Sequence, residues 1–293
     1  MEVDPAKARG HVICEEDLEF TEDLWKLYHL CIGFNEDPLN EDDFKFTYEY
    51  DDEFTTFPTI AVLALKVCLL KMFDTPGLPT FNVMSLLHGE QIVENYKAIM
   101  PNSKVRCVWV MEDLADKGKG MLMTVKIDLK DPENLDDLYS RCYMKFYVRG
   151  LGGFGDKGIL DQKIQDPPQR EPDQSVEIHT DKRLALLYRI CGDVNPLHII
   201  PSAAELSGFN KPILHGLCTY GILGKAVYDA YCEGEVSIIK SIATRFVSHV
   251  YPGETILIDM FKEGSSIFFS ASTKERGLKI STGVVELKPQ AKL

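Results

Sequence analysis

Three polar side chains with different chemistry stand close together in residues 188–198. This segment reads Tyr-Arg-Ile-Cys-Gly-Asp-Val-Asn-Pro-Leu-His, and its polar members of interest are Asp193, Asn195 and His198. A carboxylate and an imidazole at this spacing can share one water molecule, so that one takes its proton while the other supplies a proton elsewhere. The Asn195 amide can orient the water, the imidazole or a substrate carbonyl. The pattern indicates general acid–base chemistry, and an ordinary Asp-Asn-Pro turn is the structural alternative.

The next informative segment, 208–221, places His215 and Gly216 between a loop and an apolar run. We expect a helix to begin here, and the free N–H groups of a helix N-terminus attract developing negative charge. Gly216 has no side chain, so a carbonyl oxygen could approach its N–H closely. Such a donor can form part of an oxyanion hole. The alternative is that Gly216 only lets the chain turn into a buried helix.

Two further patterns carry weaker signals. Asp193, His198 and His215 offer metal-ligating atoms, but their spacing matches no standard ligand set, and we predict no metal. Residues 150–155 fit the G-x-G-x-x-G pattern of dinucleotide-binding proteins. That motif requires a helix directly after it, whereas a stretch rich in Gly, Pro and Asp follows here. We therefore interpret the region after residue 150 as a linker and predict no cofactor.

A short helix is expected to position the polar motif. Thr180 or Asp181 can cap its N-terminus, and Gly192 can end it. The three polar side chains then lie on a tight turn set by Pro196.

The same order of structural signals occurs in two halves of the chain. Each half begins with a long apolar segment of helical period, at 57–73 and at 214–231. A proline, a turn and an alternating strand follow, near 101–110 and near 252–260. The further predicted strands are 121–128, 139–149, 267–273 and 278–287. One long helix followed by antiparallel strands is typical of an α+β unit, so the sequence predicts a duplicated α+β fold.

The formal net charge of −13 comes entirely from the first fifth of the chain. Residues 1–60 hold 17 acidic and 4 basic residues, whereas the other 233 residues hold 28 of each. Nucleic acids and anionic membrane surfaces both bind basic faces, so neither is expected as the main partner. Residues 170–293, which contain the polar motif, are balanced at 14 acidic and 14 basic residues.

Cysteine usage and the two termini indicate the compartment. The eight cysteines include no C-x-x-C pair, which disfavours a zinc ribbon or a thioredoxin-like motif. The acidic N-terminus lacks the apolar core of a secretory signal, and the longest apolar stretch, 60–73, is shorter than the roughly 20 residues that span a bilayer. We therefore expect an intracellular protein with reduced thiols. The last residues, Ala291-Lys292-Leu293, are a variant of the Ser-Lys-Leu peroxisomal address.

Residues 192–198 and 208–219 closely resemble the hydratase 2 motif of the MaoC-like (R)-specific enoyl-CoA hydratases. The pattern is most similar to the hydratase 2 domain found in peroxisomal multifunctional enzymes of type 2. The resemblance extends from about residue 20 to residue 290. Further landmarks occur in the order of the family at 46–49, 57–59, 87–91, 114–120 and 152–155.

This resemblance implies a double hot-dog fold, in which each of two repeats wraps a curled antiparallel sheet around a long helix. It also implies reversible addition of water to a trans-2-enoyl-CoA, which gives the (3R)-3-hydroxyacyl-CoA. By motif match, Asp193 and His198 handle the water and the α-carbon proton, with no fixed division into acid and base. Asn195 supports this pair, and the Gly216 N–H polarises the thioester carbonyl. The family also implies a homodimer.

The resemblance assigns substrate contacts in both halves. His88, Gly89, Lys117 and Phe246 match positions that contact the CoA or acyl part of the substrate. Glu49 matches a first-half carboxylate implicated in activity, with either a catalytic or a structural role. Two alternative functions are a hot-dog acyl-CoA thioesterase, which would release free CoA thiol, and a non-catalytic acyl-CoA-binding module.

The predicted organisation has four parts. Residues 1–150 form a non-catalytic N-terminal hot-dog repeat that binds the acyl tail, and residues 151–175 form a linker. Residues 176–290 form the C-terminal repeat with the hydratase 2 motif. Residues 291–293 are the targeting tripeptide, which predicts binding to the peroxisomal import receptor and a role in peroxisomal fatty acid β-oxidation.

Overall fold

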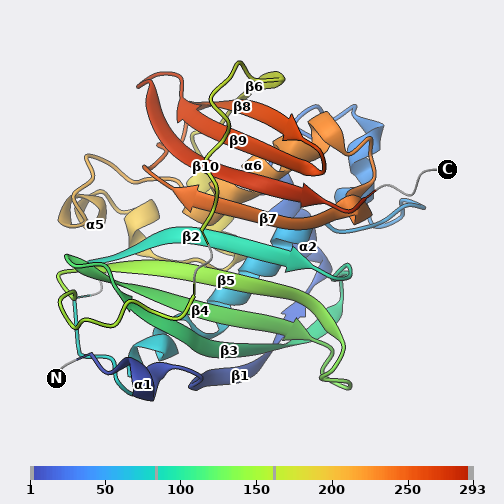
Figure 1. Cartoon of the computed structure of the whole chain (residues 1–293). Helices are drawn as coiled ribbons and strands as arrows, with labels where there is room; N and C mark the ends of the chain where they lie inside the picture. Colours follow the sequence, from blue (N-terminus) through green and yellow to red (C-terminus); the bar gives the residue numbers. More distant parts are fainter. Residues whose placement is uncertain (1–2, 83–84, 161–162, 290–293) are drawn as a thin grey trace.

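The computed structural model describes residues 3–82, 85–160 and 163–289, so the predicted targeting tripeptide at 291–293 lies outside the described residues. Within the described residues the strands form one antiparallel ten-stranded sheet, and helices pack against it (Figure 1). The strands are β1 (Val12–Phe20), β2 (Leu86–Asn95), β3 (Ser103–Asp116), β4 (Gly120–Lys130), β5 (Leu138–Arg149), β6 (Gln174–His179), β7 (Ile239–Phe246), β8 (Thr255–Glu263), β9 (Ser266–Thr273) and β10 (Leu278–Leu287).

The order of strands repeats between the two halves of the sheet. The first half contributes β1-β3-β4-β5-β2, and the second half, read from the opposite edge, contributes β6-β8-β9-β10-β7. The half-sheets join where β2 pairs with β7 (Figure 1). This repeated order confirms the predicted duplication and the α+β class. Each strand predicted from alternating apolar residues is present, and β1, β2, β6 and β7 are additional.

The helical segments differ between the halves. They are α1 (Pro5–Ala8), α2 (Glu22–Cys31), η1 (Glu41–Phe46), η2 (Pro58–Ala64), α3 (Leu65–Cys68), η3 (Leu69–Asp74), α4 (Leu184–Tyr188), η5 (Arg189–Cys191), η6 (Pro196–His198), α5 (Pro201–Leu206), α6 (Gly216–Tyr231) and η7 (Val236–Ile238), where η denotes 3₁₀ turns. The long second-half helix is confirmed as α6. The first-half segment is a continuous helical run, but only α3 within it is α-helical. The β-branched Thr59, Ile60 and Val62 near its start lower the preference for a regular α-helix.

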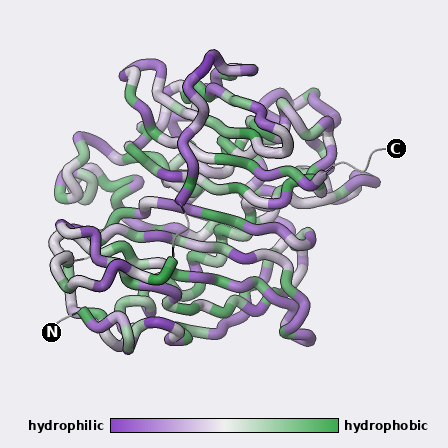
Figure 2. Tube along the Cα trace, viewed as in Figure 1, coloured by the Kyte–Doolittle hydropathy of each residue, from purple (hydrophilic) through white to green (hydrophobic). Residues whose placement is uncertain are grey.

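α6 and the first-half helical run share one core. Gly224 on α6 permits this packing, since a Cβ there would lie 3.1 Å from Ile242 and 3.2 Å from the Phe57 ring. Apolar residues follow the strands and α6, whereas the connection that crosses in front of the sheet is largely hydrophilic (Figure 2). The described residues between β5 and β6 contain neither helix nor strand, so the G-x-G-x-x-G pattern does not introduce a dinucleotide-binding helix. Within the described residues, no helix is long and apolar enough to cross a membrane.

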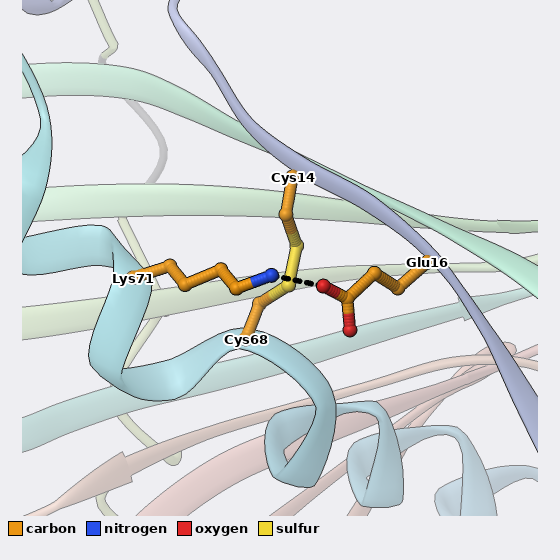
Figure 3. The surroundings of a disulfide bond; sticks show 4 residues. All are labelled: Cys14, Glu16, Cys68 and Lys71. Atoms are coloured by element: carbon orange, nitrogen blue, oxygen red, sulfur yellow. Dashed lines mark hydrogen bonds and ion pairs between the residues drawn. A yellow bond between two sulfur atoms is a disulfide. The ribbon is translucent and has the colours of Figure 1, made fainter.

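A disulfide links the first strand to the first-half helical run. Cys14 on β1 bonds to Cys68 at the end of α3, beside an ion pair between Glu16 and Lys71 (Figure 3). The expectation of reduced thiols is therefore wrong for this pair. Because the two cysteines are 54 residues apart, their pairing depends on how β1 and α3 pack, which spacing alone does not reveal. The free cysteines, all buried, are Cys31, Cys107, Cys142, Cys191, Cys218 and Cys232.

A fully buried histidine fixes the start of the helical run. His29 on α2 donates from Nδ1 to the Trp25 carbonyl oxygen at 2.7 Å and accepts from the Phe57 N–H at Nε2 over 2.9 Å. These two bonds need the neutral imidazole, because a charged ring has no acceptor. Burial lowers the pKa of His29 to about 3.

We expect His29 to make stability dependent on pH. In the unfolded chain its pKa returns to about 6.5, so stability is complete above that value and declines as pH falls toward 3. Below pH 6.5 the loss is about 1.4 kcal/mol per pH unit. Urea unfolding at pH 7 and at pH 5 measures it. The variant His29→Gln should be less stable at pH 7 but show a flatter pH dependence than the native protein, and an unchanged slope would contradict this assignment.

Candidate active site

The catalytic candidates lie on the loop between α4 and α5. Gly192 ends the preceding helical turn with a φ of 131°, a left-handed conformation that favours glycine. The Asp193 carboxylate accepts from the Asn195 N–H at 3.1 Å, and the Asn195 side-chain oxygen accepts from the Leu197 N–H at 3.1 Å. Asn195 therefore caps η6 and holds the turn. The predicted short helix, glycine stop and tight turn are confirmed, but the predicted N-cap is wrong: α4 begins after Arg183 without a side-chain cap, and the Thr180 hydroxyl donates instead to the Glu254 carbonyl oxygen.

Asp193 and His198 face each other across a short gap. Their Oδ2 and Nε2 atoms lie 3.9 Å apart, too far for a direct hydrogen bond and suited to a shared water. His198 is 8% exposed, and its Nδ1 lies 2.8 Å from the Ile213 carbonyl oxygen. Nδ1 must donate to this oxygen, so in the neutral ring the Nε2 lone pair is left facing the carboxylate.

Burial favours the neutral form of the His198 imidazole. Loss of hydration lowers the pKa of His198 below its usual value, and the negative charge of Asp193 partly opposes that shift. A neutral imidazole can accept a proton from water at Nε2. The site thus combines a basic ring nitrogen with a carboxylate on opposite sides of one small space.

A second buried imidazole supports the pair. The rings of His198 and His215 stack with their centroids 3.7 Å apart and an interplanar angle of 24°. His215 donates from Nε2 to the Asp193 carbonyl oxygen at 3.1 Å, and burial lowers the pKa of His215 to about 3. His215 is therefore a neutral group that positions both members of the pair. This role of His215 is not predicted from the sequence, where its position directly before Gly216 is the one local signal for it.

The same three side chains fit a metal poorly. Asp193, His198 and His215 bring one possible ligand atom each to within 4.8 Å of one another. Both imidazoles already use one nitrogen to contact a main-chain oxygen. Their stacked rings direct the remaining nitrogens along neighbouring planes, whereas a zinc site needs ligands that converge on one centre. The geometry suits proton transfer better than metal binding.

Gly216 lies where the two halves meet. It is the first residue of α6, and the preceding His215 makes no side-chain cap. The Phe246 ring on β7 covers Gly216, since a Cβ at this glycine would lie 3.7 Å from the ring. The His88 ring on β2 lies 5.3 Å from the Phe246 ring, measured between centroids. The structure therefore brings His88, Phe246 and Gly216 together from both half-sheets.

The remaining first-half candidates are distributed along one end of the sheet. Gly89 lies at a bulge of β2, where the register with β5 shifts between His88 and Glu90. Lys117 is exposed on the turn between β3 and β4. The strand register places this turn at the end of the sheet where β2 begins. Both residues therefore lie toward the same end as His88.

Glu49 has a different environment. It lies on a turn after η1 and forms an ion pair with Lys26 of α2 at 3.1 Å. Among the described residues, no hydrogen bond or ion pair joins Glu49 to Asp193, His198 or Gly216. The observed contact is the one expected of a structural role.

Two family models match consecutive parts of the chain. The model described as MFE-2 hydratase 2 N-terminal domain matches residues 18–150, and the MaoC like domain matches residues 163–284. A probable enoyl-CoA hydratase 2 of Dictyostelium discoideum is 36% identical, with 99% of this chain and 98% of that protein aligned. The peroxisomal multifunctional enzyme type 2 of Mus musculus is 36% identical over 96% of this chain, which spans 38% of that longer protein.

Solved structures agree with the fold. The crystal structure of a MaoC-like dehydratase from Phytophthora capsici has a TM-score of 0.87 at 32% identity, covering 99% of this chain and 98% of that one. A Mycobacterium tuberculosis protein described as a double hotdog fold has a TM-score of 0.59 at 8% identity, covering 96% of each chain. The fold and these relatives together define a double hot-dog enzyme of the hydro-lyase class. Within that class, the chain belongs to the MaoC-like hydratase 2 family.

The electrostatic coupling of Asp193 and His198 can be measured directly. In Asp193→Asn the carboxylate charge that raises the pKa of His198 is lost while burial remains, so we expect His198 to titrate at lower pH. Nitrogen-15 NMR of the imidazole rings gives this titration. His249, which faces Arg276 and Glu254 instead, is the internal control and should not move. An unchanged or raised His198 pKa in the variant would show that the two groups do not interact.

Proposed function

We propose that this protein catalyses the reversible hydration of a trans-2-enoyl-CoA to the (3R)-3-hydroxyacyl-CoA. The observation that carries this proposal is the pairing of Asp193 and His198 across 3.9 Å, with both members in contact with His215, the residue directly before Gly216 at the start of α6. Family membership supports it, and relatives over the full length of this chain carry the name enoyl-CoA hydratase 2. The (R) configuration of the product is part of the proposal and follows from the resemblance to (R)-specific hydratases.

The proposed reaction needs two proton transfers and one site for negative charge. A water held between Asp193 and His198 loses a proton to one of them as its oxygen bonds to C3 of the enoyl group. The pair then delivers that proton to C2, so the elements of one water are added across the double bond and both groups return to their starting forms. Between these events the thioester oxygen carries enolate charge, which the Gly216 N–H stabilises by hydrogen bonding. We assign the two transfers to the pair as a coupled unit.

The substrate would lie across the seam between the halves. We propose that His88, Gly89 and Phe246 contact the thioester region, and that Lys117 pairs with a phosphate of CoA. The first repeat, residues 1–150, would hold the acyl tail without contributing to proton transfer, residues 151–175 would link it to the second repeat, and the second repeat, 176–290, would supply the chemistry.

One contact supports the placement of the acyl tail. The Lys66 stem on α3 packs against Gly192, where a Cβ would lie 2.6 Å from Cδ of that lysine. The first-half helical run therefore borders the catalytic loop. An acyl chain that reaches C3 beside Asp193 would continue toward this run.

Activity is tested by the loss of ultraviolet absorbance when a trans-2-enoyl-CoA is hydrated, with chiral analysis of the product. We expect Asp193→Ala and His198→Ala each to lower kcat/KM by about 10²–10⁴-fold, since each removes an acid–base group. Asp181→Ala is the matched control, because Asp181 is an exposed second-half carboxylate that pairs with Arg183.

Three results would contradict the proposal. Full activity of both alanine variants would refute the site. Release of free CoA thiol, detected by a thiol reagent, would instead identify a thioesterase. Tight binding of enoyl-CoA without turnover would identify a binding module.

We further propose that the protein acts in peroxisomal fatty acid β-oxidation, as a homodimer. The C-terminal Ala291-Lys292-Leu293 and the peroxisomal names of several relatives support the location. Deleting these three residues should remove the protein from peroxisomes, because the import receptor reads this address. Replacing them with Ser-Lys-Leu is the control and should preserve import. A deleted form that still enters peroxisomes would show that another signal directs it.

A further inference from the structure

The glycine-rich connection, residues 150–160, surrounds a carboxylate of the protein itself. Asp116, at the end of β3, is 4% exposed. Its two carboxylate oxygens accept main-chain N–H bonds from Gly118 at 2.7 Å, Gly153 at 3.0 Å and Gly155 at 2.6 Å. The N–H donors lower the pKa of Asp116 to about 2. The glycines that resemble a phosphate-binding loop therefore bind an internal anion.

Close packing of main chains makes this arrangement specific. Gly153 and Gly155 have φ values of 87° and 85°, a conformation that favours glycine. A Cβ at Gly152 would overlap the carbonyl oxygen of Gly118. The Gly150 N–H also donates to the Lys119 carbonyl oxygen at 2.9 Å. The turn between β3 and β4 is thus held from two sides by the connection.

This turn carries Lys117, which is exposed. Asp116 precedes it directly, and the Lys117 N–H donates to the Gly120 carbonyl oxygen at 2.9 Å. The backbone on both sides of Lys117 is therefore fixed, while its ammonium group remains free to meet a ligand. A cation held on a rigid turn loses less conformational entropy on binding than one on a flexible loop.

We propose that Asp116, through its bonds to Gly153 and Gly155, is a positioning residue that presents Lys117 to a phosphate group of the CoA thioester. This inference rests on the proposed function. In this proposal the glycine-rich connection contributes to substrate affinity and takes no part in proton transfer. The effect should therefore appear in KM, and only for substrates that carry a phosphate.

Asp113 provides a matched control on the same strand. It is 2% exposed, and it binds the Arg9 guanidinium at 2.7 Å and the N–H groups of Ile159 and Leu160 at 2.9 and 3.2 Å. It therefore anchors the same connection without touching the turn that carries Lys117. Asp113→Asn and Asp116→Asn keep side-chain size and remove one buried charge each, so both should lower the melting temperature.

The experiment compares two substrates, an enoyl-CoA and the enoyl thioester of N-acetylcysteamine, which has no phosphate. We expect Asp116→Asn and Lys117→Ala each to raise KM for the enoyl-CoA by about tenfold with little change in kcat, the size of one lost charged hydrogen bond. Neither should change kcat/KM for the short thioester. Asp113→Asn should leave KM for both substrates unchanged. The double variant Asp116→Asn/Lys117→Ala should be no worse than Lys117→Ala alone, because both act through one contact.

A second variant that should disturb the turn carrying Lys117 is Gly155→Ala. It strains a φ of 85° and so shifts one N–H donor of the Asp116 carboxylate, while Asp116 itself is unchanged. It should reproduce the KM effect, and it replaces Asp116→Asn if that variant does not fold. Equal KM values for native protein, Asp116→Asn and Gly155→Ala would overturn the inference, as would an equal loss with the short thioester. If the native protein hydrates neither thioester, the proposed function fails instead.

Discussion

The pairing of β2 with β7 is the contact on which the candidate site depends. It is the seam between the two half-sheets, and it runs from Glu90 opposite Arg245 to Glu94 opposite Ser241. Glu90 pairs with Arg245 across the seam at 3.1 Å and with Lys145 of β5 at 2.9 Å, so the register is held by charge as well as by main-chain bonds. A slip of one residue would turn every side chain of a strand to the other face.

Each side of this seam contributes a different part of the site. β7 ends at Phe246, whose ring covers Gly216, and β2 brings the His88 ring beside it. The candidate acid–base pair comes from the loop between α4 and α5, so the candidate site draws residues from both halves of the chain. Burial lowers the pKa of both His198 and His215 and so favours the neutral rings, the form that the proposed proton transfer requires of His198.

Much of this arrangement was predictable from the sequence. Strands with alternating apolar residues, the helix α6 and the turn with Asp193, Asn195 and His198 all have strong local signals, and the structure confirms them. The 3₁₀ character of η2 was not predicted, because helical periodicity does not separate α from 3₁₀ turns when tertiary packing decides. β1 was missed since its many acids hide the alternation of a sheet edge.

Other features depend on contacts between distant parts of the chain. The disulfide of Cys14 with Cys68, the stacking of His215 on His198 and the pairing of Glu49 with Lys26 each join residues whose proximity only the fold defines. The connection between the repeats is a similar case. Its composition predicts a flexible linker, yet Asp113 and Asp116 bind its main chain and hold it on the first half-sheet.

The two repeats are not equivalent, because only one of them carries the candidate catalytic motif. The run η2–α3–η3 corresponds in order to α6, but the Asp-x-Asn-Pro-Leu-His motif occurs only in the second half of the sequence. Two identical repeats would carry this motif twice, at equivalent places on either side of the seam, whereas this chain has one copy of the motif for two repeats. Under the proposed function, each chain therefore offers one reaction centre. The first repeat, free of the constraints of the proposed proton transfer, could then diverge with the shape of the acyl group while the chemistry stays unchanged.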